Sequence, residues 1–181
     1  MKLWHLLEGL ANLVRTGWMQ RGVPPAMGET VALHSFYAAT IALEIGERLK
    51  DMGIEVNPLK ASAIALAHDI GEALVGDMPK WSTDRIKEVK EKLEVEALNS
   101  MDLKIAGYAK EYFEVTKESL IAKVSETLAT LWQAEKYIKM GIDRVTEIKE
   151  SMERSLEKTL KKAEELDPEF ARALKEVISH L

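Results

Sequence analysis

The side chains of this chain that could do chemistry together follow the apolar run 61–67. The run leads directly into His68 and Asp69, and Glu72 and Asp77 come within the next eight residues. An apolar run of this kind belongs in a protein interior, where an ionised carboxylate is costly unless a partner or a metal meets it. We therefore interpret the stretch as an active site rather than as a core helix.

The first candidate chemistry is metal binding by His68 and Asp69. Neighbouring residues on a helix point about 100° apart, so both side chains can reach one ion that lies beside the helix. Glu72 follows four and three positions later and would share their face. The alternative is a helix with one polar edge and a solvent-exposed Glu72. A His-Asp pair alone is weak support for a site, but the apolar run before it argues against that alternative.

Further ligands have to come from elsewhere in the chain, since a divalent ion bound by two histidines and an aspartate wants a fourth ligand. His34 lies among small residues that leave room for an ion, although a histidine in such a place is more often a hydrogen-bonded core residue. Glu126 is a plausible fourth ligand, with an ordinary exposed glutamate as the equal alternative. His5 and His180 lack acidic neighbours arranged for ligation. The absence of cysteine excludes a thiolate site.

A second group, Trp18 and Arg21, precedes His34. An arginine suits a phosphate, and a tryptophan suits the face of a sugar or a ring. The alternative is a tryptophan that packs its loop onto the core.

Helical periodicity supplies the elements that must position these residues. No stretch shows the alternation typical of a strand, so the sequence predicts an all-α fold in a single domain, 1–181. Gly53 and Gly141 should each end a helix, and Asn57-Pro58 should begin one. We expect a loop at 18–25 and helices over 3–15, 29–52, 58 onward through His68, 82–99, 102–115, 117–140, 143–166 and from 168 to the end.

Composition narrows the class of protein further. The 181 residues carry a net charge of −5, with a pI of about 5.5. The chain therefore lacks the excess of basic residues that is typical of nucleic-acid-binding proteins. No apolar run approaches the roughly 20 residues of a membrane span. The N-terminus lacks the pattern of a secretory signal, so we expect a cytoplasmic protein without membrane or nucleic-acid partners.

In combination these residues resemble the HD-domain metal-dependent phosphohydrolases, and within them the 5′-deoxynucleotidase branch. The resemblance spans about residues 14–135 and rests on Gly17-Trp18, Arg21-Gly22-Val23, Glu29 to Ser35 with His34, His68-Asp69-Ile70-Gly71-Glu72, Val75-Gly76-Asp77-Met78-Pro79 and Lys123-x-x-Glu126. It implies an all-helical HD-domain bundle that holds one divalent ion, namely cobalt, manganese, nickel, zinc or magnesium. It also implies hydrolysis of deoxyribonucleoside 5′-monophosphates to deoxynucleoside and phosphate, commonly by homodimers.

Carried over by position, the resemblance makes His34, His68 and Asp69 metal ligands, makes Glu72 and Asp77 the catalytic acids, and places Trp18 where a 2′-hydroxyl would clash. Two positions depart from the family pattern. Glu126 stands where an aspartate is usual, and its extra methylene can still reach a metal. Gly17 stands where close relatives have arginine, so Arg15 or Arg21 would supply the cation that binds phosphate.

Two alternatives remain open at this stage. One is another HD-domain phosphoesterase, acting on a cyclic nucleotide or guanosine tetraphosphate; the lack of an obvious second ligand set argues against many of these. The other is a non-catalytic helical scaffold, which the glutamate at 126 favours. In that case the charged helix 143–166 could bind a partner helix, although its mixed charge is more typical of a solvated outer helix or a dimer arm.

Overall fold

The protein is helical from end to end in the computed structural model, which describes residues 2–83 and 85–181. Within these residues no strand forms, and the sole β-type pairing is an isolated bridge between Val14 and Thr30. The predicted all-α fold class is therefore confirmed. None of the described helices combines the length and the apolar character that crossing a membrane requires.

Eleven helices and two 3-10 turns follow one another along the described residues. They are α1 (Leu3–Asn12), α2 (Thr16–Gln20), the turn Pro25–Met27, α3 (Val31–Asp51), α4 (Pro58–Ala67), α5 (Glu72–Val75), α6 (Lys80–Thr83), α7 (Lys87–Ser100), α8 (Ile105–Glu111), α9 (Lys117–Lys139), the turn Asp143–Val145, α10 (Thr146–Leu166) and α11 (Pro168–Ser179).

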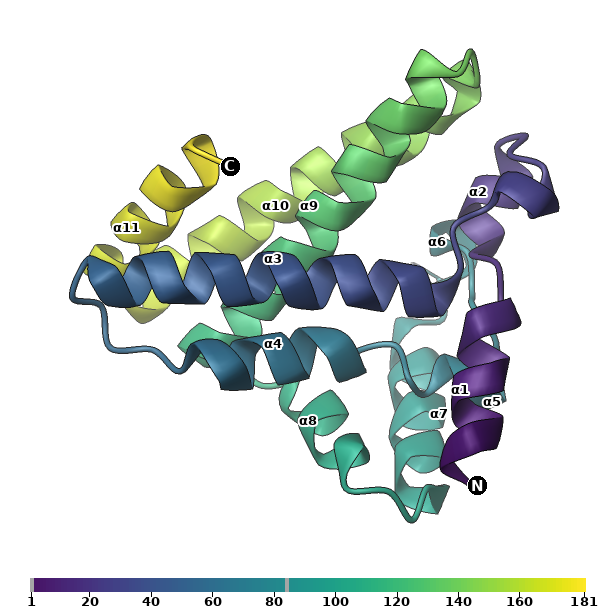
Figure 1. Ribbon diagram of the computed structural model, residues 1–181, viewed down its shortest axis with the longest axis horizontal. Helices are drawn as coiled ribbons and strands as arrows, with labels where there is room; N and C mark the ends of the chain where they lie inside the picture. Colours follow the sequence, from purple (N-terminus) through teal and green to yellow (C-terminus); the bar gives the residue numbers. More distant parts are fainter. Residues whose placement is uncertain (1, 84) are drawn as a thin grey trace.

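The long helix α3 runs through the middle of the molecule (Figure 1), and α4 and α9 both pack against it. α10 lies along α9, and α11 packs on α10 and α3. The main core lies between these helices and is built mostly from small and branched side chains, including Ala38, Ala42, Ile45, Ile64, Leu120, Val124, Phe170 and Leu174. A Cβ on Gly46 would lie 2.8 Å from the Cα of Pro58, so glycine is required where α3 meets the start of α4.

Local signals fix the ends of the helices that carry the site. Asn57 caps α4 by accepting a hydrogen bond from the backbone N–H of Lys60 at 3.0 Å, and Pro58 is its first residue, as predicted. Gly53 and Gly141 follow α3 and α9 with φ angles of +83° and +87°, which glycine adopts without strain.

Several predicted boundaries are wrong. The predicted loop 18–25 begins inside a helix, because residues 16–20 form α2. The helix that holds the apolar run ends at Ala67, since the next residues form tight turns: the N–H of Ile70 donates to Ala67, and that of Glu72 donates to Asp69. His68, Asp69 and Glu72 therefore do not share one regular helix face.

Elsewhere the differences are shorter stretches of helix. The first helix ends at Asn12, because the following residues pair with the segment before α3 through the Val14–Thr30 bridge. The charged helix begins at Lys87 rather than at 82 or 83, after the separate short helix α6. The helix predicted over 102–115 is restricted to α8.

Candidate active site

Three of the four predicted metal ligands lie together. His34 comes from the first turn of α3, and His68 and Asp69 come from the turn that follows α4. Each offers a ligand atom, and these atoms lie within 4.8 Å of one another. The two imidazole rings pack edge to face with their centres 5.3 Å apart. Close packing of α3 on α4 therefore assembles the group from two separate segments.

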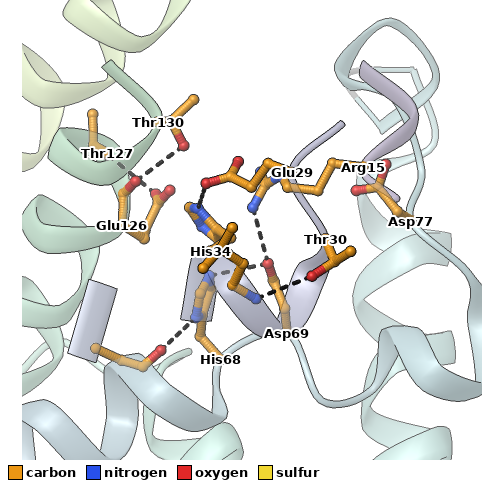
Figure 2. A network of polar contacts seen from close by, with 12 residues as sticks. Arg15, Glu29, Thr30, His34, His68, Asp69, Asp77, Glu126, Thr127 and Thr130 are labelled. Carbon is orange, nitrogen blue, oxygen red and sulfur yellow. Dashed lines mark hydrogen bonds and ion pairs between the residues drawn. The ribbon is translucent and has the colours of Figure 1, made fainter. Parts of the chain in front are cut away.

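The orientation of His68 suits metal binding. Its Nδ1 lies 2.7 Å from the backbone carbonyl of Ala65, a position that calls for a proton on Nδ1 and leaves the lone pair on Nε2. Nε2 lies 3.1 Å from Oδ2 of Asp69 (Figure 2). Burial opposes a charge on the ring, but the carboxylates of Asp69 and Glu126 outweigh it and raise the pKa of His68. The carboxylates around His68 thus favour positive charge at this position.

His34 carries the clearest sign of a missing partner. The side chain is fully buried, and neither of its ring nitrogens has a hydrogen-bond partner. Burial and the charge of Arg15 lower its pKa, so the ring is favoured in the neutral form that ligates metals. Two imidazoles and a carboxylate are donors that suit first-row divalent ions. The residues present therefore fit a divalent metal.

Asp69 is held ionised by its neighbours. The guanidinium of Arg15 approaches it, with Nη1 3.5 Å from Oδ2. Burial acts to raise the pKa of Asp69, but His68, Arg15 and His34 together hold it well below its usual range. A carboxylate that keeps its charge is available to a cation at any ordinary pH.

Glu126, the fourth predicted ligand, lies outside the group of three, although it lines a cavity together with His68 and Asp69. Its Oε1 accepts hydrogen bonds from the hydroxyl of Thr127 at 3.1 Å and from that of Tyr112 at 3.4 Å. Its charge nevertheless contributes to the raised pKa of His68. Glu126 therefore stays a predicted ligand. In the structure its carboxylate is hydrogen-bonded to two hydroxyl groups.

A cavity of about 600 Å³ opens beside His68 and Asp69 and contains both predicted catalytic acids. Glu72 is buried, and its Oε2 has no hydrogen-bond partner. Burial and the charges of Asp69 and Asp77 raise the pKa of Glu72 well above its usual range. The carboxylate of Asp77 accepts a hydrogen bond from the backbone N–H of Thr16, which ties the turn after α5 to the start of α2.

The predicted substrate-binding residues lie on or next to α2 and line this cavity. Trp18 is buried, donates a hydrogen bond from its indole N–H to Glu29 at 2.9 Å, and packs edge to face on Tyr137. It thus packs its segment onto the core, as the alternative interpretation expected, and also faces the cavity.

The two predicted phosphate-binding arginines differ in their partners. Arg15 lies beside Asp69, whereas Arg21 pairs with Glu147 of α10 at 2.8 Å.

Sequence reasoning gave no role to three residues of the site. Glu29 is buried between Trp18 and His34. The ring of Tyr112 packs 5.3 Å from that of His68, and Lys90 lines the cavity from α7. Glu29 stands just before the cap of the helix that carries His34, which was the one available signal. Lys90 comes from α7, whose rotation no local pattern fixes, and Tyr112 comes from the turn that follows α8.

Comparison with known proteins places this geometry in context. The family model for the HD domain matches residues 7–167. A 5′-deoxynucleotidase HDDC2 of Dictyostelium discoideum is 33% identical over 132 residues, which are 71% of this chain and 67% of that protein.

Solved structures give the same picture of the fold. A conserved hypothetical protein of Pyrococcus furiosus is 32% identical and superposes with a TM-score of 0.73, covering 84% of this chain and 92% of the other. A Pyrococcus horikoshii protein is 28% identical with a TM-score of 0.71, over 93% and 96% of the two chains. An HD-domain phosphohydrolase of Listeria innocua, 22% identical with a TM-score of 0.65 over 95% and 81%, shares the fold.

Proposed function

This chain belongs to the HD-domain phosphohydrolase family, and within it we propose that the protein hydrolyses deoxyribonucleoside 5′-monophosphates to deoxynucleoside and phosphate. One observation carries the proposal. The ligand atoms of His34, His68 and Asp69 lie within 4.8 Å of one another, and His68 and Asp69 line a cavity together with Glu72 and Asp77. Such a cavity offers a cation site and two further acids to one phosphate ester.

The proposed metal site consists of His34, His68 and Asp69, with Glu126 as the fourth ligand. When bound there, a divalent ion supplies positive charge to the phosphate oxygens and activates water for attack. The chain contributes the orientation: Ala65 fixes the ring of His68, and Asp69 is kept ionised by its cationic neighbours.

Glu72 is the proposed general base or water-orienting residue. It lies on the cavity wall one short turn after Asp69, and its buried Oε2 is free to accept a hydrogen bond from a water or a substrate hydroxyl. A raised pKa brings a carboxyl group closer to the working pH, which is what proton transfer requires. Asp77 is proposed to contact the leaving 5′-oxygen, and the two roles could be exchanged.

Positive side chains of the cavity are proposed to bind the substrate phosphate. Arg15 is the one nearest the ligand group, since it contacts Asp69. Arg21 lies further out, paired with Glu147. Lys90 is a third cation of the same wall, paired with Glu94 at 2.9 Å and partly buried. These groups would offset the dianionic charge that repels a nucleophile.

Trp18 is the proposed discriminator between deoxyribose and ribose. Its ring lines the cavity and is fixed by contacts with Glu29 and Tyr137, so it cannot easily turn aside. A rigid ring against the 2′-carbon of the sugar leaves no room for a hydroxyl.

Assembly as a homodimer belongs to the same proposal and is measured by light scattering on the purified chain.

The deciding experiment is phosphate release from all eight common ribo- and deoxyribonucleoside 5′-monophosphates. Each is assayed after chelation and after addition of cobalt, manganese, nickel, zinc or magnesium. We expect metal-dependent release that favours the deoxyribonucleotides. Cyclic nucleotides and guanosine tetraphosphate are tested in parallel. Hydrolysis of these alone, followed as the nucleoside monophosphate or the pyrophosphate formed, would assign another phosphoesterase activity. No metal-dependent release from any of them would leave the scaffold interpretation.

A further inference from the structure

Glu29 is a buried carboxylate that joins two parts of the site. It lies just before α3 and is only 2% exposed. Its Oε2 accepts the indole N–H of Trp18 at 2.9 Å, and its Oε1 lies 3.8 Å from Nδ1 of His34 (Figure 2). Burying an ionised carboxylate is costly, so one that is retained inside a fold calls for an explanation.

Neighbouring backbone holds the carboxylate in this position. The N–H of Glu29 donates to the hydroxyl of Tyr137 at 2.8 Å, and its carbonyl accepts from the N–H of Arg15 at 3.0 Å. The segment before α3 is therefore fixed to α9 on one side and to the start of α2 on the other. The side chain of Glu29 therefore has little freedom to move away from His34.

The two proposed ligand histidines differ in the acceptor group that lies near their Nδ1 atoms. For His68 it is the backbone carbonyl of Ala65 at 2.7 Å. For His34 a carboxylate oxygen, Oε1 of Glu29, lies 3.8 Å from Nδ1, and neither atom has a hydrogen-bond partner. A metal-ligating imidazole almost always donates its second N–H to a carboxylate or a carbonyl, because that bond fixes the tautomer and the ring orientation.

We propose that Glu29 is a positioning residue that keeps the proton of His34 on Nδ1, so that Nε2 faces the metal, while its second oxygen fixes Trp18 against the cavity. The inference rests on the proposed metal site. One carboxylate then orients a ligand and the ring that faces the sugar, so metal binding and sugar selection depend on the same buried group. The negative charge of Glu29 also makes His34 a stronger metal ligand.

The test is Glu29→Gln, which keeps the shape and removes the charge. The amide oxygen can still accept from Trp18, so the amide N–H₂ faces Nδ1 of His34 and favours a proton on Nε2 instead. The exposed Glu47→Gln on α3 is the matched control for the same change of charge. His34 tautomers are read from nitrogen chemical shifts of chelator-treated protein, with His34→Gln assigning the signals, and metal affinity is read by competition with a chromophoric chelator.

We expect the Nδ1–H tautomer in the unsubstituted protein and the Nε2–H tautomer in Glu29→Gln. Metal affinity should fall by roughly 10- to 100-fold in that variant and stay unchanged in Glu47→Gln. The proposal is overturned if the unsubstituted protein shows the Nε2–H tautomer, or if the metal affinity of Glu29→Gln is within about twofold of that of the unsubstituted protein.

If Glu29→Gln does not fold, the tautomer of the unsubstituted protein decides alone. If that protein binds no metal, the proposed function fails, while the tautomer still decides the role of Glu29.

Discussion

The hydroxyl of Tyr112 lies 3.4 Å from Oε1 of Glu126 and donates a hydrogen bond to it. The hydroxyl of Thr127 donates to the same oxygen, and the carboxylate lies outside the group formed by the three converging ligands. A glutamate has one more rotatable bond than an aspartate, so its carboxylate can move between positions more easily. The role of Glu126 in metal binding is therefore a measurable question of side-chain position.

Glu126→Gln removes the charge and keeps the size of this side chain. We expect the affinity for a divalent ion to fall roughly tenfold or more, since a neutral amide is a weaker ligand for a cation. The measurement is competition with a chromophoric chelator. Glu135→Gln, an exposed residue of the same helix, is the control and should bind metal normally. Unchanged affinity in Glu126→Gln would remove it from the ligand set.

Glu72→Gln separates chemistry from metal binding. We expect kcat to fall by about 10²- to 10⁴-fold, the usual contribution of a positioned acid or base. Bound metal, measured by elemental analysis, should stay stoichiometric, because Glu72 is not part of the group of three ligands. The exposed Glu88→Gln on α7 serves as control. Full turnover by a metal-loaded Glu72→Gln protein would exclude it from the mechanism.

Trp18→Phe tests sugar selection with less damage than Trp18→Ala. Truncating a buried tryptophan to alanine costs about 3–5 kcal/mol, and Trp18 is only 2% exposed, so the alanine variant would lose stability as well. We expect the smaller ring to lower the ratio of kcat/KM for deoxyadenosine over adenosine monophosphate by roughly tenfold or more. Trp4→Phe, at an exposed position of α1, should leave the ratio as it was. An unchanged ratio in Trp18→Phe would assign sugar selection elsewhere.

Much of the fold could be predicted because its signals are local. Asn57 and Pro58 begin a helix through their own side chains, and Gly141 follows a helix through a backbone conformation that other residues avoid. The grouping of His34 with the His68-Asp69 pair was predicted from residue types and family resemblance, and the packing of α3 on α4 places their ligand atoms within 4.8 Å of one another.

The rest depends on contacts that no local pattern encodes. The helix after the apolar run ends at Ala67 because turn hydrogen bonds and the contact of His68 with Ala65 replace the regular ladder. The position of the Glu126 carboxylate depends on Tyr112, which arrives from a different segment. Glu29 was expected at the start of the helix 29–52, but α3 begins at Val31, so helical periodicity does not extend to Glu29 and could not indicate that it is buried.

Asp167 gives a prediction for stability against acid. Its carboxylate caps α11 by accepting from the N–H groups of Glu169 and Phe170, and it pairs with Lys117 at 2.8 Å. The hydrogen bond from Lys117 and those of the cap lower the pKa of Asp167 in the folded protein. Its contribution to stability is therefore complete above the unfolded pKa, about 3.9, and is lost as the pH falls through the lower folded value.

Asp167→Asn keeps the cap and removes the ion pair with Lys117. We expect a lower Tm than that of the unsubstituted protein at pH 7, and a difference that shrinks as the pH is lowered below the unfolded pKa. Thermal unfolding followed by circular dichroism measures both curves. The exposed Asp51→Asn at the end of α3 is the control. A difference in Tm that stays constant down to the acid transition would contradict the assignment of the lowered pKa to this ion pair.

Metal removal should destabilise the folded chain, because the ligands come from segments that meet only on folding. An ion that binds the folded state alone adds about 2.7 kcal/mol to the free energy of unfolding at a concentration 100 times its Kd. For a chain of this size that corresponds to a rise in Tm of roughly 5–10 °C. Differential scanning calorimetry of chelated and metal-loaded protein measures the shift.

Histidine variants locate the ion that causes this shift. His34→Asn and His68→Asn should each abolish most of the rise in Tm, since each removes a ligand of the group. His180→Asn, at the exposed end of α11, should keep all of it. A full rise in His34→Asn would place the stabilising ion away from α3. In that case the buried ring of His34, with no partner for either nitrogen, would have to be explained by a role in the core.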